Sequence, residues 1–167
     1  AMLHYYFRNK QQLFDIILDD KISKVFDVFQ VWAQPHLNFE QKLRKFVEEE
    51  INLIKSFPIL PLFIMLEARK NPDLIPTKLK NFPIQDVKAT FQNIIQTDID
   101  KGNIRPVKME EIILNTMSLC VYPIIAAPLF QYTFKVDSSA YLDYLEERKQ
   151  LVPDMILRDL NYKTPKN

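Results

Sequence analysis

The chain has 167 residues, of which 47% are hydrophobic and 26% are charged, and its 22 basic residues nearly cancel its 21 acidic ones. This composition fits one globular domain with a sizeable core and excludes a largely disordered chain. The small net charge of +1 also excludes a body that binds nucleic acid through a broad basic surface, so any DNA contact is expected only near the N-terminus.

Glycine and cysteine are both rare in this sequence. The single glycine, Gly102, argues against a fold rich in tight turns and favours helices. The single cysteine, Cys120, excludes a disulfide within the chain. Since no secretory leader is present in the sequence, we expect a reducing, cytoplasmic location.

The first two predicted helices begin with the same signal. Asn9 and Asn38 are each followed three residues later by glutamine, which is a capping-box pattern, and apolar residues then recur at helical spacing. The first helix is expected to end near Pro35. The second is expected to end at Pro58, because proline disfavours helical geometry in the residue that precedes it.

Three more segments follow before the middle of the chain. A short helix is predicted over residues 60–69, and the segment 76–83, bracketed by two prolines, is either a loop or a single helical turn. Another helix is predicted over residues 84–101. Gly102 follows it, where a left-handed residue commonly caps a helix.

Two long helices complete the prediction, one over residues 108–125 and one over residues 141–160, which Pro153 is expected to bend. No repeat, low-complexity tract or strand alternation interrupts this pattern. The fold predicted from the sequence is therefore one all-α domain of about six helices.

The segment from Ile112 to Phe134 contains no charged residue and is long enough for a transmembrane helix. However, Pro123 and Pro128 interrupt it, and the mean hydropathy of the chain is only −0.16. We therefore interpret the segment as a central helix covered by its own domain on one side and by a second subunit on the other, rather than as a membrane span. Pro123 lacks the N–H that would bond to Leu119, so we expect a kink there.

Two glutamates, Glu50 and Glu67, fall on the apolar stripes of their helices. Such a carboxylate either pairs with a nearby lysine or arginine, lies at the edge of the stripe and reaches water, or contacts a ligand. The ligand interpretation predicts a mostly apolar site for a lipophilic molecule, including a cationic one. Its predicted lining residues are Phe29, Trp32, Phe46, Glu50, Phe63, Glu67, Phe91 and Met117.

Catalysis is the least favoured class of function. The only histidines are His4 and His36, and neither they nor Cys120 has the spacing of a zinc site. No glycine-rich loop is present to bind phosphate. We therefore expect no enzyme activity, no metal and no cofactor.

Residues 3–14, with the sequence LHYYFRNKQQLF, resemble the junction between the recognition helix and the ligand-binding body of TetR-family transcriptional regulators. The resemblance implies a truncated helix-turn-helix in residues 1–9 and a ligand-binding and dimerisation domain in residues 10–167. It also implies that His4, Tyr5, Tyr6 and Lys10 contact DNA, with Lys10 on a phosphate. Without the motif, Tyr5 and Tyr6 would be interpreted as a packing seam between two helices.

The resemblance further implies a homodimer that binds operator DNA and releases it when a lipophilic small molecule occupies the helical body. The segment 101–107 and the helix after it are similar to the family's entry to its penultimate helix. The last two long helices would then form the dimer interface. The alternative is a helical domain that binds a protein or a membrane surface without DNA or inducer. The predicted interface residues are Leu119, Tyr122, Tyr141, Leu145, Val152 and Ile156.

Overall fold

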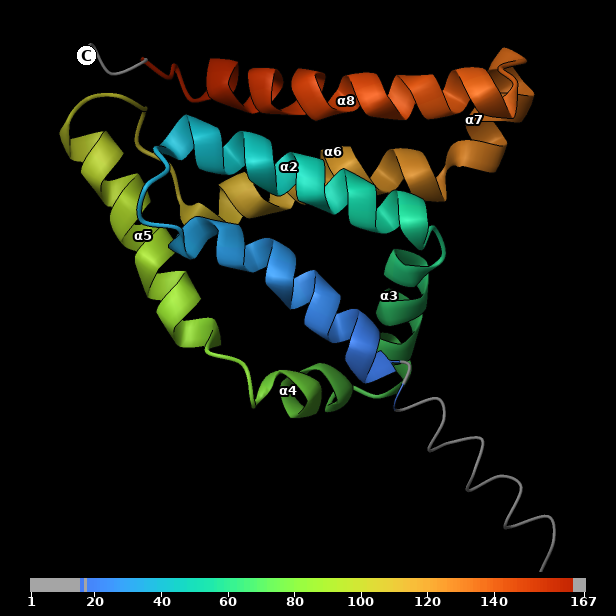
Figure 1. The fold of residues 1–167 in the computed structure, drawn as a ribbon, viewed down its shortest axis with the longest axis horizontal. Coiled ribbons are helices and arrows are strands. Elements are labelled where there is room, and N and C mark those ends of the chain that lie inside the picture. Colours follow the sequence, from blue (N-terminus) through green and yellow to red (C-terminus); the bar gives the residue numbers. More distant parts are fainter. Residues whose placement is uncertain (1–15, 17, 164–167) are drawn as a thin grey trace, which may run out of the picture.

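The computed structural model describes residue 16 and residues 18–163, and every regular element in these ranges is helical. The predicted all-α class is therefore confirmed. A first helix over residues 18–29 carries no label in Figure 1 and is drawn there in blue. It is followed by the 3-10 helix η1 (Gln30–Ala33), α2 (Phe39–Ser56), α3 (Leu60–Lys70), α4 (Leu74–Leu79), α5 (Ile84–Asp100), α6 (Met109–Ile125), α7 (Ala127–Phe134) and α8 (Ser138–Asp159).

Helix α2 lies at the centre of the arrangement and packs chiefly against α8 and α6 (Figure 1). The first helix runs beside α2 on the side away from α8, with α5 flanking one of its ends and α3 the other. The short helix α4 lies at the edge of the molecule opposite α8. The first helix is thus enclosed by α2, α3, α4, α5 and α6, and this arrangement determines where cavities form.

The start of α2 confirms the predicted capping box. The Asn38 side chain accepts a hydrogen bond from the Gln41 N–H at 2.9 Å, and the Gln41 side chain accepts one from the Asn38 N–H at 3.0 Å. Two backbone donors that would lack partners at a helix start are satisfied in this way. The helix ends at Ser56, just before Pro58, as the sequence predicts.

Three other local predictions can be compared with the structure. Gly102 has a φ of 69°, which is the left-handed conformation expected after α5. The segment bracketed by two prolines contains the last turn of α4, which also includes Pro76, so it is neither wholly a loop nor a separate helical turn. The first helix changes to 3-10 geometry at Gln30, where the Lys42 ammonium donates a hydrogen bond of 2.9 Å to the Trp32 carbonyl.

The charge-free segment forms two helices rather than one. The axes of α6 and α7 meet at 63°, so the change of direction predicted at Pro123 occurs three residues later, at Ala126. Within the described ranges no single helix has the length and hydropathy to cross a membrane, although the bent pairs α2 with α3 and α6 with α7 meet that criterion jointly.

Side chains from α8 satisfy the backbone that Pro123 disrupts. Because proline has no N–H, the Leu119 carbonyl loses its helical donor, and the buried Arg148 guanidinium donates to it instead at 2.7 Å. The Tyr141 hydroxyl donates to the Pro123 carbonyl. Arg148 also donates to the Tyr144 hydroxyl at 2.9 Å. The proline in α6 thus explains the buried arginine of α8, whereas Tyr141 satisfies a carbonyl in the last turn of α6.

Replacing Arg148 by methionine is expected to lower the free energy of unfolding by about 1–3 kcal/mol, because the buried Leu119 carbonyl is left without a donor. The cost should be smaller in a Pro123→Ala background, since alanine restores the helical N–H. Urea denaturation of the four proteins of this double-mutant cycle measures the coupling. Tyr144→Phe is the matched control, because it removes the other hydrogen bond of Arg148 and leaves the donor to Leu119 in place. An equal cost of Arg148→Met with Pro123 and with alanine at position 123 would contradict the explanation.

Four of the six predicted dimer-interface residues are instead part of the chain's own core. Tyr141, Leu145, Val152 and Ile156 are at most 5% exposed, and the cluster to which they belong is built from α2, α5, α6 and α8. Side chains so deeply buried have no surface left for a second chain, so their assignment was wrong. The apolar stripe of α8 is used by the domain itself.

Candidate ligand-binding site

Two mainly apolar cavities lie beside the first helix. The Trp32 cavity, of about 360 Å³, is enclosed by the first helix, η1, α3, α4, α5 and α6. The Glu50 cavity, of about 710 Å³, lies between the first helix, α2, α3 and α6. Both volumes are within the range of small-molecule sites.

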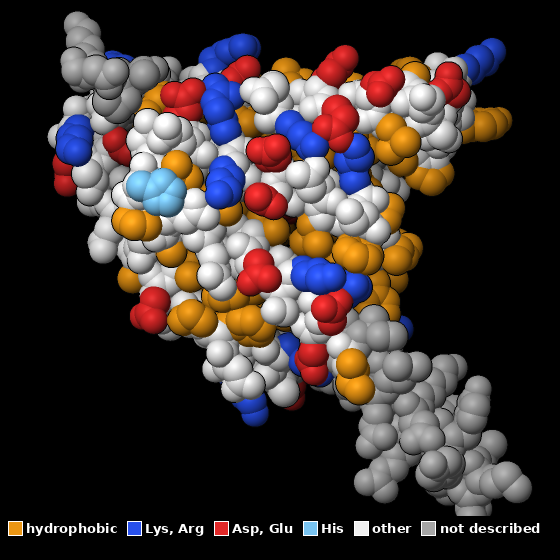
Figure 2. Space-filling view, viewed as in Figure 1, with side chains coloured by type: hydrophobic (Ala, Val, Ile, Leu, Met, Phe, Trp, Pro, Cys, Tyr) orange, Lys and Arg blue, Asp and Glu red, His pale blue; other side chains and the backbone are white. Residues whose placement is uncertain are grey.

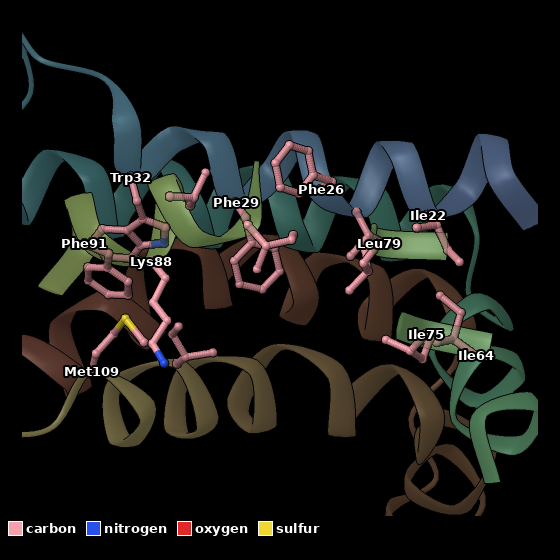
Figure 3. A pocket seen from close by; sticks show the side chains of 14 residues that line it. Ile22, Phe26, Phe29, Trp32, Ile64, Ile75, Leu79, Lys88, Phe91 and Met109 are labelled. Carbon is pink, nitrogen blue, oxygen red and sulfur yellow. The ribbon is translucent and has the colours of Figure 1, made fainter. Parts of the chain in front are cut away.

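The Trp32 cavity is lined almost entirely by hydrocarbon and aromatic groups (Figure 3). Lys88 of α5 is the one charged side chain that residues 18–163 place on its wall, and Lys88 is exposed to water. The cavity can therefore hold an apolar group, and the described residues give it no buried charged partner. Its lining residues are Ile22, Val25, Phe26, Phe29, Trp32, Ile64, Ile75, Leu79, Ile84, Val87, Lys88, Phe91, Met109 and Ile113.

Aromatic packing holds Trp32 in place at one end of this cavity. Its ring stacks on Phe91 with centroids 3.7 Å apart and an interplanar angle of 17°, and the Phe46 ring packs beside it at 5.6 Å. Trp32 is only 1% exposed, and its buried indole N–H has no hydrogen-bond acceptor among the described residues. Trp32 is therefore a rigid wall with one unsatisfied donor.

The Glu50 cavity is larger and differs from its neighbour by containing a carboxyl group. Glu50 of α2 contributes this group, and Ser118 and Tyr122 of α6 are the other polar side chains on the wall. Apolar residues form the remainder. They are Val25, Val28, Phe29, Leu53, Ile54, Leu60, Pro61, Ile64, Met65, Leu114, Met117, Leu119, Val121 and Ile125.

The carboxyl group of Glu50 is buried without compensation. The residue is 7% exposed, and its Oε2 atom has no hydrogen-bond donor in the part of the chain that the structure describes. Burial raises the pKa of Glu50 to about 7, because the ionised form loses its hydration. Near neutral pH the group therefore exists as a mixture of carboxylic acid and carboxylate.

Cys120 of α6 is influenced by the charge of Glu50 and by that of Arg148. Burial, reinforced by the Glu50 charge, raises the pKa of the Cys120 thiol of α6, and Arg148 of α8 opposes this shift. Cys120 therefore remains a neutral thiol and is not a nucleophile at ordinary pH. Arg148 forms no ion pair with Glu50, since its hydrogen bonds go to Leu119 and Tyr144.

The two cavities share three wall residues, namely Val25, Phe29 and Ile64. Val25 and Phe29 belong to the first helix, so both cavities border the same face of it. Phe29 packs against Phe46 with ring centroids 5.2 Å apart. A molecule bound in either cavity would therefore touch the first helix.

Five of the eight predicted ligand residues line these cavities. Trp32 and Phe91 meet in the Trp32 cavity, Glu50 and Met117 meet in the Glu50 cavity, and Phe29 borders both. The sequence correctly places these residues beside a cavity, although it predicts one site where the structure has two. Whether either cavity binds a ligand stays a prediction.

The other three predicted ligand residues lie elsewhere. Phe46 is fully buried behind the cavity walls, where it supports Phe29 and Trp32. Glu67 pairs with Lys70 at 2.8 Å, which is the simpler alternative considered for it, and lines neither cavity. Phe63 also lines neither. The assignment of Phe46 was wrong because helical spacing does not distinguish a wall from the core behind it. Glu67 and Phe63 are partly exposed, and neither cavity supports their assignment as ligand contacts.

Several wall residues were not predicted from the sequence. Val25 and Ile64 were recognisable as apolar helix positions, but nothing in the pattern marked them as shared walls. Lys88 and Ser118 gave no signal, because isolated polar residues on helices are usually solvated. Tyr122 was predicted at a dimer interface, and the structure places its exposed side chain on the wall of the Glu50 cavity.

The predicted DNA-contacting residues His4, Tyr5, Tyr6 and Lys10 lie outside the described residues, as does the predicted boundary between residues 9 and 10. Figure 2 shows basic and acidic side chains interspersed over the face formed by α8 and α2, without a block of one sign. That face therefore has no concentrated basic surface for a duplex.

The described residues also contain no cluster of three or more His, Cys, Asp or Glu side chains that could hold a metal ion. The chemistry available in this site is therefore that of apolar enclosure combined with one uncompensated carboxyl group. Comparison with known proteins found no matching family model and no similar curated protein.

Proposed function

We propose that the chain is the ligand-binding and dimerisation part of a TetR-like transcriptional regulator, with the end of its DNA-recognition helix in residues 1–9. A homodimer would bind operator DNA through His4, Tyr5, Tyr6 and Lys10. A lipophilic small molecule bound in the helical body would lower that affinity. The all-α fold is compatible with this proposal, and the motif in residues 3–14 is its basis in the sequence.

The observation that best supports ligand control is the position of the first helix. Its side chains Val25 and Phe29 border both cavities, and in the sequence it follows directly after the motif that resembles a DNA reader. A ligand that fits better when this helix is displaced would shift the population toward a conformation with a different reader position. The proposed regulation needs only that difference in affinity between two conformations.

For the dimer, we propose a face that the domain's own core leaves free. Tyr144, Leu151 and Met155 of α8 are exposed and lie seven and four residues apart, on one side of the helix. Arg148 links Tyr144 to the Leu119 carbonyl of α6, which places this side of α8 next to Leu119. Of the interface residues predicted from the sequence, Leu119 and the exposed Tyr122 remain candidates.

Replacing Leu151 by glutamate is expected to weaken dimerisation roughly 100-fold, because a charge would be buried without a partner at the proposed face. Leu142 provides a matched control, since nine residues, or about two and a half turns, place it on the opposite side of α8. Sedimentation equilibrium of both variants measures the effect. A monomeric parent protein, or equal weakening by Leu142→Glu, would exclude this face.

The regulator proposal is tested with the complete gene product and a pool of random-sequence duplexes. We expect selection of a two-fold symmetric sequence whose half-sites are about one helical turn apart. Lys10→Ala should weaken binding and reduce the slope of log affinity against log salt concentration by about one, because one phosphate contact is lost. Lys108→Ala, an exposed lysine of the body, is the control. If no sequence is enriched, the proposal is wrong.

A second candidate function is a helical interaction domain without DNA binding, and α7 is the observation that favours it. Leu129, Tyr132 and Phe134 of this helix are all more than 60% exposed, and Figure 2 shows hydrophobic side chains gathered along the edge where α7 and α3 lie. Sedimentation with phosphatidylcholine vesicles distinguishes a membrane-binding role. Binding abolished by Tyr132→Ser, together with a failed duplex selection, would favour this candidate.

A further inference from the structure

The Glu50 cavity combines features that are costly for the folded domain when no ligand is bound. A carboxyl group is buried with an unpartnered oxygen, and it borders a space of about 710 Å³ with mostly aliphatic walls. Buried polar groups in proteins normally have partners, and the exceptions call for an explanation. A ligand that supplies a hydrogen-bond donor at Glu50 and hydrocarbon against the walls would compensate both costs.

In its ionised form the carboxyl group can only accept hydrogen bonds, so the partner that this form lacks is a donor. We propose that the Glu50 cavity binds a lipophilic primary, secondary or tertiary amine in its protonated form, with an N–H of the ammonium group donating to Glu50. This inference rests on the proposed role of the cavity as the ligand site and names the chemical class of the ligand. A single cationic centre is expected, since Glu50 is the only carboxyl group that the described part of the chain places on the wall.

The wall residues of the Glu50 cavity also favour protonated amines over quaternary ammonium ions and over lipophilic anions. A quaternary ammonium ion has no N–H to donate to the Glu50 carboxylate, and it is usually bound by a cage of several aromatic rings. Among the described residues, the aromatic side chains on the wall are only Phe29 and Tyr122. A fatty acid or another lipophilic anion would place a second negative charge beside Glu50, and no lysine or arginine of the described ranges lines this cavity to compensate it.

The charged and titratable neighbours of Glu50 determine how binding depends on pH. Tyr122 on the cavity wall and Cys120 belong to α6, and Arg148 belongs to α8. The wall residues from the first helix and from α3 are all apolar. Glu50 is therefore the group whose ionisation is expected to control the affinity for an amine near neutral pH, and lowering the pH protonates it and removes the ion pair.

The experiment is isothermal titration calorimetry of the chain with four ligands that share a decyl group. Decylamine is expected to bind at least about tenfold more tightly at pH 8 than decanol, decanoate or decyltrimethylammonium. Its affinity should fall about tenfold between pH 8 and pH 6, as Glu50 becomes protonated. The affinity for decanol should not change over this range.

Glu50→Gln should remove both the preference for the amine and the pH dependence while leaving decanol binding within about twofold. Glu48→Gln, which removes an exposed carboxylate of the same helix, should change neither. Circular dichroism of both variants verifies that they are folded. Tighter binding of decanoate or of the quaternary ion, or unchanged amine binding by Glu50→Gln, would overturn the proposal.

These outcomes are independent of the regulator proposal, because the titrations contain no DNA. Amine selectivity combined with a failed duplex selection would establish an amine-binding domain with another role. A successful duplex selection without amine selectivity would leave the regulator proposal intact and exclude this class of ligand. Failure of the amine proposal and failure of the regulator proposal can therefore be told apart.

Discussion

Replacing Glu50 by glutamine is expected to increase stability relative to the wild-type protein by about 3 kcal/mol more at pH 8 than at pH 4.5. In the unfolded chain the carboxyl group ionises near its ordinary pKa of 4.5, whereas in the folded chain its pKa is about 7. The folded state thus retains a proton that the unfolded state has already released. Stability is consequently lost as the pH rises from 4.5 through 7, and glutamine removes this loss.

Urea denaturation of both proteins at several pH values measures the difference. The informative quantity is the change in the stability difference with pH, because glutamine has its own cost as a buried amide without partners. Glu49→Gln is the matched control, since Glu49 is an exposed neighbour on the same helix and should give a pH profile parallel to that of the wild type. Parallel profiles for Glu50→Gln would mean that Glu50 is hydrated.

The second large effect is expected at Trp32, where replacement by alanine should lower the free energy of unfolding by about 3–5 kcal/mol. The residue is 1% exposed, it stacks on Phe91, and its loss would leave a void next to the existing Trp32 cavity. The side chains around Trp32 already border a cavity, so they cannot easily move in to fill the void that the indole ring leaves. Thermal and urea denaturation measure the loss.

Trp32→Phe separates the role of the ring from that of the indole N–H. Phenylalanine retains a ring that can stack on Phe91 and removes the buried N–H that has no acceptor, so its cost should be roughly 1 kcal/mol. A cost as large as that of alanine would show that the indole N–H has a partner. In any study of ligand binding, Phe29 is the better probe, because it borders both cavities and is not fully buried.

These predictions concern one property of the domain. Around the first helix, cavities and buried polar groups without partners lower the free energy of unfolding. Trp32 has an unsatisfied indole N–H and Glu50 an uncompensated carboxyl group, and these two residues line adjoining cavities that share Phe29. A ligand with affinity for the folded state alone would raise stability through mass action. Regions that respond to ligands are commonly of this less stable kind.

The amino-acid sequence by itself determined the local structure of this protein. The capping box at Asn38, the end of α2 before Pro58 and the left-handed Gly102 each depend on a few neighbouring residues, so these could be read directly. The apolar spacing of Glu50 placed a carboxyl group on an apolar stripe, and the structure shows that it is buried. Such properties require only the geometry of a single helix.

Only the tertiary structure decided against which neighbour each apolar helix face packs. Spacing showed that Tyr141, Leu145, Val152 and Ile156 share one side of a helix, but that side packs on the domain's own core instead of on a second subunit. Likewise, Glu50 and Glu67 have similar patterns, yet Glu50 borders a cavity whereas Glu67 is partly exposed and pairs with Lys70. Helical periodicity specifies that a face is buried but not its partner, since the partner depends on the crossing of helices distant in the sequence.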